Sequence, residues 1–125
     1  MAHTALTVLA PIRDGTDLET LRCVLDDVGD SVYENSSEGS YIRMRSIPEL
    51  HFLRFALVKD PDRGPDCVRL LFAAVIDGDD KAGFFDRLRA ATNDTDGIWG
   101  NCLEYPGEDG FAEFMCSRNI EPAAF

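Results

Sequence analysis

Few residues in this 125-residue sequence could carry out chemistry, and none of them stands in an established catalytic pattern. The only histidines are His3 and His51, so a catalytic dyad or a haem ligand would have to use one of these two. The glycine-rich nucleotide-binding, P-loop, nucleophile-elbow and zincin patterns do not occur. The sequence therefore assigns no catalytic residue, and candidate binding residues must be judged from the elements that carry them.

His51 and Arg54 lie three residues apart in a segment with the alternation of a strand, so we expect their side chains on opposite faces of a sheet. We expect His51, together with Leu53 and Phe55, to face the helices. It is either a structural histidine bonded to the backbone at the strand entrance, or a ligand or general base. Arg54 then faces the other side, either in a structural salt bridge or as a site for an anion or a substrate carboxylate.

Trp99 and Tyr105 complete the set of candidate binding residues, which is His51, Arg54, Trp99 and Tyr105. Each ring combines a large apolar body with a polar tip, so we expect both to anchor the segment after the second helix to the core. A catalytic tyrosine or a redox-active Cys102 is the alternative, although no base or second thiol lies nearby in the sequence.

The cysteines are too far apart for the usual metal sites. They are Cys23, Cys67, Cys102 and Cys116, with no C-x-x-C pair. Zinc and iron–sulfur sites usually take two ligands from one tight turn. We therefore predict no metal site, and we expect buried, reduced thiols that behave as small hydrophobic groups.

Composition narrows the class of protein. The chain has 23 Asp and Glu against 12 Lys and Arg, a formal net charge of -11. Nucleic acids and anionic membranes are recognised by clustered basic residues, so we expect neither as a partner. No apolar run approaches the roughly 20 residues that span a bilayer, and residues 1–12 lack the pattern of a signal peptide. We predict one cytoplasmic domain over residues 1–125.

The elements that position the candidates follow from hydrophobic periodicity. We predict strands at 5–12, 50–59, 69–76 and 120–125. We predict one helix that Thr16 caps, a second that Asp79 or Asp80 caps and Asn93 stops, a helical turn at 96–102 and a short helix around 111–115. Gly29 could end the first helix, or the stripe could continue through Val32. The polar segment 33–49 is either a mobile insertion or a lid or contact loop.

This order predicts an α+β domain of ferredoxin-like type, βαββαβ, with a four-stranded antiparallel sheet whose first and third strands are central. The crossover rule places both helices on one face of the sheet. The other face, with Ala5, Thr7 and Leu9 from the first strand, is too apolar to remain exposed to water. A second copy of the same sheet is the simplest cover, so we expect a homodimer.

Several short motifs resemble one family. They are His51-Phe-Leu-Arg54-Phe, Leu71-Phe72 with Asp77-Gly78, Ile98-Trp99, Cys102 and Tyr105-Pro106-Gly107. Over residues 50–125, and more weakly before them, the chain resembles an uncharacterised bacterial family of the dimeric α+β barrel superfamily. Some members occur next to or fused with haem peroxidase or catalase-like domains.

The resemblance implies a dimeric barrel that acts as a binding or accessory module, with a peroxidase-like protein as the partner. The alternative is a cofactor-free monooxygenase or isomerase that acts on a small apolar or aromatic substrate in a cavity at the sheet face. No cofactor is required by the sequence, and a role for haem would depend on His51 alone. Fold analogy does not choose among these functions.

Overall fold

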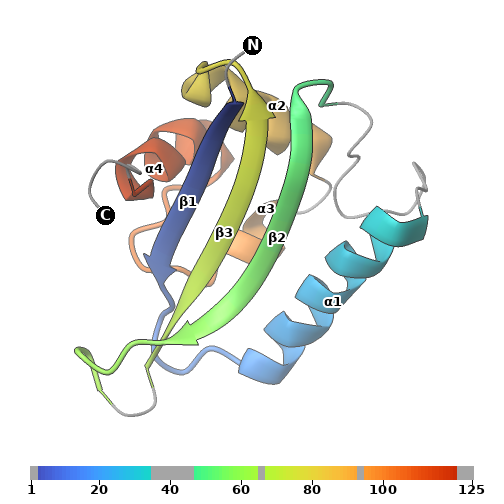
Figure 1. Ribbon diagram of the computed structural model, residues 1–125. Helices are drawn as coiled ribbons and strands as arrows, with labels where there is room; N and C mark the ends of the chain where they lie inside the picture. Colours follow the sequence, from blue (N-terminus) through green and yellow to red (C-terminus); the bar gives the residue numbers. More distant parts are fainter. Residues whose placement is uncertain (1–2, 35–46, 65–66, 93–94, 121–125) are drawn as a thin grey trace.

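The computed structural model describes residues 3–34, 47–64, 67–92 and 95–120. Over these residues the protein is α+β, with a three-stranded antiparallel sheet in the order β1-β3-β2 and four helices (Figure 1). The elements are β1 (His3–Pro11), α1 (Leu18–Glu34), β2 (Leu50–Lys59), β3 (Val68–Asp77), α2 (Lys81–Ala91), α3 (Thr95–Trp99), the 3-10 turn η2 (Glu108–Gly110) and α4 (Phe111–Arg118). The three predicted strands 5–12, 50–59 and 69–76 are therefore confirmed.

The central strand is β3, as its apolar residues on both faces predict. It pairs with β1 in the register Thr7 to Ala73 and with β2 in the register Arg54 to Ala73. The outer edge of β1 carries the chain's last described residues. Asn119 forms an antiparallel bridge with Val8, and the Ile120 N–H donates to the Thr7 carbonyl over 2.7 Å.

The predicted fourth strand would continue from this point, but residues 121–125 lie outside the described part of the chain, as do residues 35–46 of the predicted long loop. α1 extends through Gly29 to Glu34, so Gly29 does not end the helix.

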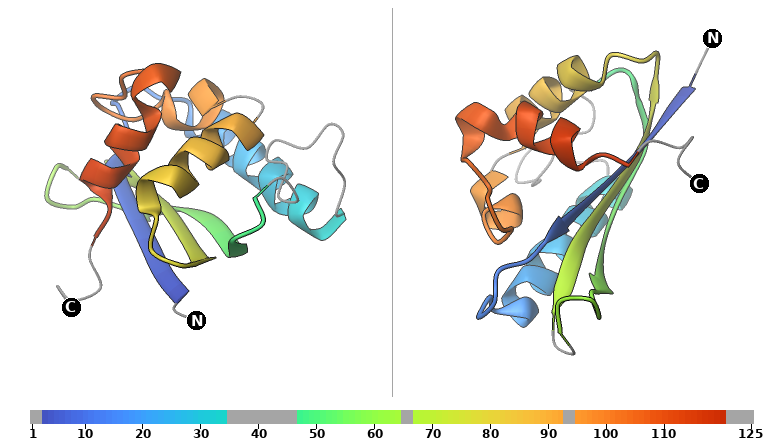
Figure 2. Two further views of the ribbon diagram at one scale, coloured as in Figure 1. Left: turned by 90° about the horizontal axis from the view of Figure 1, so that it is seen from above. Right: turned by 90° about the vertical axis from the view of Figure 1, so that its left-hand side faces the viewer.

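All four helices lie on the same face of the sheet (Figure 2), as the crossover rule predicts. Their apolar residues meet alternate strand residues in one core. Each of the predicted inward positions of α2 and α4 is buried: Phe84, Phe85, Leu88, Ala91, Phe111, Phe114 and Met115. Leu6, Val8, Leu70, Phe72 and Ile76 supply the sheet side of this core.

The cap of α2 agrees with the prediction from the sequence, and the cap of α1 differs from it. Asp80 caps α2, since its carboxylate accepts from the Gly83 N–H over 3.0 Å. The cap of α1 is Asp17 rather than the predicted Thr16, because Asp17 Oδ1 accepts from the Thr20 N–H over 3.2 Å. A carboxylate at this position also interacts favourably with the helix dipole.

Among the described residues, no helix combines the length and apolarity that a bilayer crossing requires.

Candidate functional site

None of the described helices covers the second face of the sheet, which we call the uncovered face (Figures 1 and 2). The strand residues that point to it alternate with the buried ones: Ala5, Thr7, Leu9, Phe52, Arg54, Ala56, Val58, Arg69, Leu71, Ala73 and Val75. Most of them are apolar, and the side chain of Phe52 is 50% exposed. The predicted open, apolar face is therefore present in the described part of the protein.

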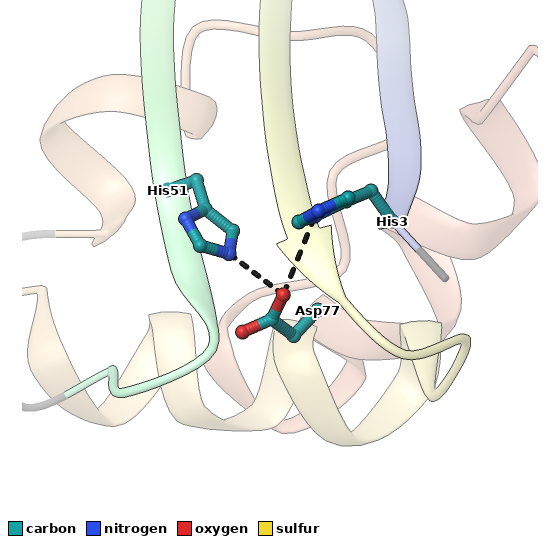
Figure 3. Close-up of side chains that lie close together, drawn as sticks. All are labelled: His3, His51 and Asp77. Carbon is teal, nitrogen blue, oxygen red and sulfur yellow. Dashed lines mark hydrogen bonds and ion pairs between the residues drawn. The ribbon is translucent and has the colours of Figure 1, made fainter. Parts of the chain in front are cut away.

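Three polar side chains converge at one end of this face (Figure 3). His3 comes from the first residue of β1, His51 from the start of β2 and Asp77 from the last residue of β3. His51 Nε2 donates to Asp77 Oδ1 over 2.7 Å, and His3 Nδ1 lies 3.3 Å from the same oxygen. The two imidazole rings are in edge contact, with centroids 4.9 Å apart. We call these three residues the His-Asp cluster.

An irregularity in β2 brings His51 into this cluster. Leu50 pairs with Ile76 and Phe52 pairs with Val75, so His51 is an extra residue at a bulge. A bulge interrupts the alternation of the strand and redirects a side chain. As a result His51 and Phe52 both reach the uncovered face, while Leu50 packs against the core. The expectation that His51 faces the helices is therefore wrong, and its partner is a carboxylate rather than the backbone.

The cluster is electrostatically coupled although it is open to water. The hydrogen bond from His51 is the main cause that lowers the pKa of Asp77, and the charges of His51 and His3 act in the same direction. The three side chains are 58%, 48% and 34% exposed for His3, His51 and Asp77. Asp77 is thus held as a carboxylate, with two imidazole nitrogens on one oxygen.

Arg54 lies on the uncovered face, as predicted, in the row that it shares with Ala73 and Thr7. Its side chain is exposed and forms no hydrogen bond or ion pair with any residue that the structure describes. The interpretation as a buried structural salt bridge is therefore wrong for this part of the protein. An arginine without a carboxylate partner on an apolar surface leaves its guanidinium available to an anion.

Trp99 and Tyr105 are on the other side of the sheet. Trp99 is fully buried against the rings of Phe55, Phe72 and Phe111, and Tyr105 packs edge-on against Phe114. Both anchor the segment after α2 to the core, which confirms that expectation. Burial, with the neighbouring Asp96 as a second cause, raises the pKa of Tyr105 well above its usual range. The structure thus separates these two residues from His51 and Arg54.

Sequence reasoning missed two members of the cluster, His3 and Asp77. From the sequence, His3 is considered only as one of the two histidines, and Asp77 is named only beside Gly78, a pair that is typical of a turn. The turn is present, since Gly78 follows with φ of +80°. The available signal was the position of both residues at strand ends, which the order β1-β3-β2 places side by side.

The cysteines differ in exposure more than expected. Cys102 is buried, Cys67 is half-buried, and Cys23 and Cys116 are exposed; all four are free thiols. The expectation of reduced thiols stays a prediction, whereas the expectation of burial holds only for Cys102. Burial raises the pKa of Cys102 to about 12.

We expect the Cys102 thiol to be inert in the native protein. With a pKa of about 12, only about one thiol in 10⁴ is ionised near pH 8, and the thiolate is the reactive form. Alkylation with iodoacetamide followed by peptide mass spectrometry should label Cys23 and Cys116 in native protein, and Cys102 only after unfolding. Labelling of native Cys102 at the rate of Cys23 would contradict the buried position.

Comparison with known proteins identifies no relative: no protein-family model, curated protein or solved structure matches this chain significantly. The family resemblance and the partner that it implies therefore remain expectations. Any function must be argued from the uncovered face and from the cluster at its end.

Proposed function

We propose that this protein is a homodimeric binding module in which two ferredoxin-like sheets face one another and hold a small apolar anion between them. The observation that carries the proposal is the uncovered face, an apolar sheet surface with Arg54 in its middle row, and Arg54 has no hydrogen-bond or ion-pair partner among the described residues. Ligand sites combine apolar walls with a few polar groups that fix orientation, and this surface has that composition.

The size of the face favours a second copy as its cover. Strands of 9, 10 and 10 residues, at about 3.3 Å per residue and about 4.8 Å between strands, give roughly 33 Å by 14 Å. Two such faces bury about 900 Å² in projection, and stable interfaces bury about 1,200–2,000 Å². The sheets would supply most of a small interface, and the segments that flank them the rest.

The charges on the face are also compatible with self-association. Asp77 and Arg69 lie at opposite ends of β3, both pointing to the uncovered face. Arg69 Nε is buried and has no hydrogen-bond partner among the described residues. A two-fold axis across the strands would place the acidic end of one sheet against the Arg69 end of the other. Such a self-complementary arrangement is what an isologous dimer requires.

A small aromatic carboxylate tests the binding proposal. We expect benzoate to bind to the wild-type protein and to shift the NMR signals of residues on the uncovered face, because its ring matches the apolar wall and its carboxylate the Arg54 guanidinium. Arg54→Gln should weaken binding by about 10- to 100-fold, which corresponds to a charged hydrogen bond of about 1.5–3 kcal/mol.

Arg22→Gln is the matched control. Arg22 is an exposed arginine of α1, on the helix side of the sheet, so its loss changes the net charge equally but leaves the face intact. Absence of benzoate binding to the wild-type protein, or equal weakening in both variants, would contradict the proposed function.

A further inference from the structure

We propose that His3, His51 and Asp77 bind a divalent transition-metal ion, with Zn²⁺ as the best match. Two imidazole nitrogens and one carboxylate oxygen are the donor set of many catalytic zinc sites and of non-haem iron sites. The inference does not depend on the dimer or on benzoate binding, since all three ligands come from one chain.

The distances between donor atoms are close to those of a metal site. In a tetrahedral zinc site with bonds of about 2.0–2.1 Å, neighbouring donor atoms lie about 3.3 Å apart. Here His3 Nδ1 and Asp77 Oδ1 are 3.3 Å apart, and His51 Nε2 and Asp77 Oδ1 are 2.7 Å apart. All three donor atoms lie within 4.8 Å of one another. Shifts of about an ångström in exposed side chains would complete the geometry.

The backbone holds the three ligands in place. They occupy one end of three adjacent hydrogen-bonded strands, with His3 directly paired to Asp77 in the register of β1 and β3. The Asp77 N–H donates to the Glu49 carbonyl over 2.9 Å, and the Thr4 hydroxyl donates to the Gly78 carbonyl. Ligands on strands of a sheet need little reorganisation to bind an ion.

The bulge at His51 is the feature that a merely structural contact does not explain. In a regular β2 the side chains of His51 and Phe52 would lie on opposite faces of the sheet. The exposed ion pairs of the cluster contribute little to the stability of the fold, so they do not account for the bulge. Bulges are common next to functional sites, where they redirect a side chain. On metal binding the proton on His51 Nε2 would move to Nδ1 of the same ring through solvent, and bonds to the ion would replace the two contacts to Asp77 Oδ1. In the single chain, the exposed side of the cluster leaves further coordination positions for water or an anion.

Titration of tag-free protein with Zn²⁺, and with Co²⁺ as a spectroscopic probe, tests this site. We expect one ion per chain by calorimetry and visible Co²⁺ bands typical of nitrogen and oxygen ligands. His51→Ala and Asp77→Asn should each weaken binding by more than about 100-fold, because loss of even a second-shell partner costs about 10- to 100-fold. Zn²⁺ at a hundredfold excess over Kd should raise the melting temperature by roughly 10 °C.

Asp79→Asn is the matched control, since Asp79 is an exposed carboxylate two residues from Asp77 and outside the cluster. It should bind Zn²⁺ as the wild-type protein does, and circular dichroism should show that all variants fold. The proposal is overturned if the wild-type protein binds no ion, or if His51→Ala and Asp77→Asn bind as tightly as Asp79→Asn. His3→Ala should also weaken binding, and the proposal is overturned if His3→Ala is the only variant that does so, because His51 and Asp77 would then not be ligands.

Discussion

Replacement of Trp99 by alanine is expected to destabilise the protein by about 3–5 kcal/mol, a large share of the roughly 5–15 kcal/mol that stabilises a typical domain. Trp99 is the only tryptophan of the chain and is fully buried. Its ring lies 4.8 Å from that of Phe111 in α4, 5.5 Å from Phe55 in β2 and 6.0 Å from Phe72 in β3. One side chain thus joins the sheet to two helices.

The matched variant is Trp99→Phe, which keeps an aromatic ring and removes the indole N–H. This N–H is buried without a hydrogen-bond partner among the described residues, and an unsatisfied buried donor is itself unfavourable by about 1–3 kcal/mol. We therefore expect Trp99→Phe to lower the free energy of unfolding by less than about 1.5 kcal/mol. Urea unfolding followed by circular dichroism measures the stability of both variants. Tryptophan fluorescence is not suitable, because both substitutions remove the only tryptophan. An equal decrease in the free energy of unfolding for Trp99→Ala and Trp99→Phe would show that the contacts of the aromatic ring contribute little to stability.

Substitution of Leu71 by arginine on the uncovered face is expected to separate the proposed dimer into monomers. Leu71 lies on the central strand between Leu9 and Ala56, so it occupies the middle of the face. An arginine there would be buried without a partner in the dimer, whereas in a monomer its head can reach water. Centrally placed hot-spot residues contribute at least about 2 kcal/mol, so the dissociation constant should rise by at least about 30-fold.

Sedimentation equilibrium over a dilution series measures this effect. The wild-type protein should sediment as a dimer at high concentration and dissociate on dilution, and Leu71→Arg should remain monomeric over the same range. Leu103→Arg is the control, since Leu103 is a 38% exposed apolar residue that lies outside the sheet. A wild-type protein that is monomeric at every concentration would contradict the dimer and leave the metal site to be judged by its own titration.

The proposed benzoate site and the proposed metal site on the uncovered face depend on different residues. The benzoate proposal requires a covered apolar surface and the guanidinium of Arg54, whereas the metal proposal requires the His-Asp cluster at the end of the strands. Arg54→Gln should therefore leave Zn²⁺ binding unchanged, and Asp77→Asn should leave the row of Arg54, Ala73 and Thr7 intact. This difference allows one proposal to fail while the other holds.

The sequence by itself determined the local structure, that is, the positions of the strands and the buried sides of the helices. Alternating apolar residues predicted the three described strands, and steps of three and four residues predicted the buried sides of α2 and α4. The placement of Arg54 on the face away from the helices followed from the same alternation. These patterns are reliable because each depends on neighbouring residues and on the repeat of one element.

Tertiary structure alone decided the candidate site. His51 and Asp77 are 26 positions apart and meet only because β2 and β3 are neighbours, and His3 joins them from β1. The bulge that directs His51 to the uncovered face has no signature in the alternation of β2. Pairing between strands depends on the packing of the whole sheet, so a contact across three strands is not encoded by any short stretch of sequence.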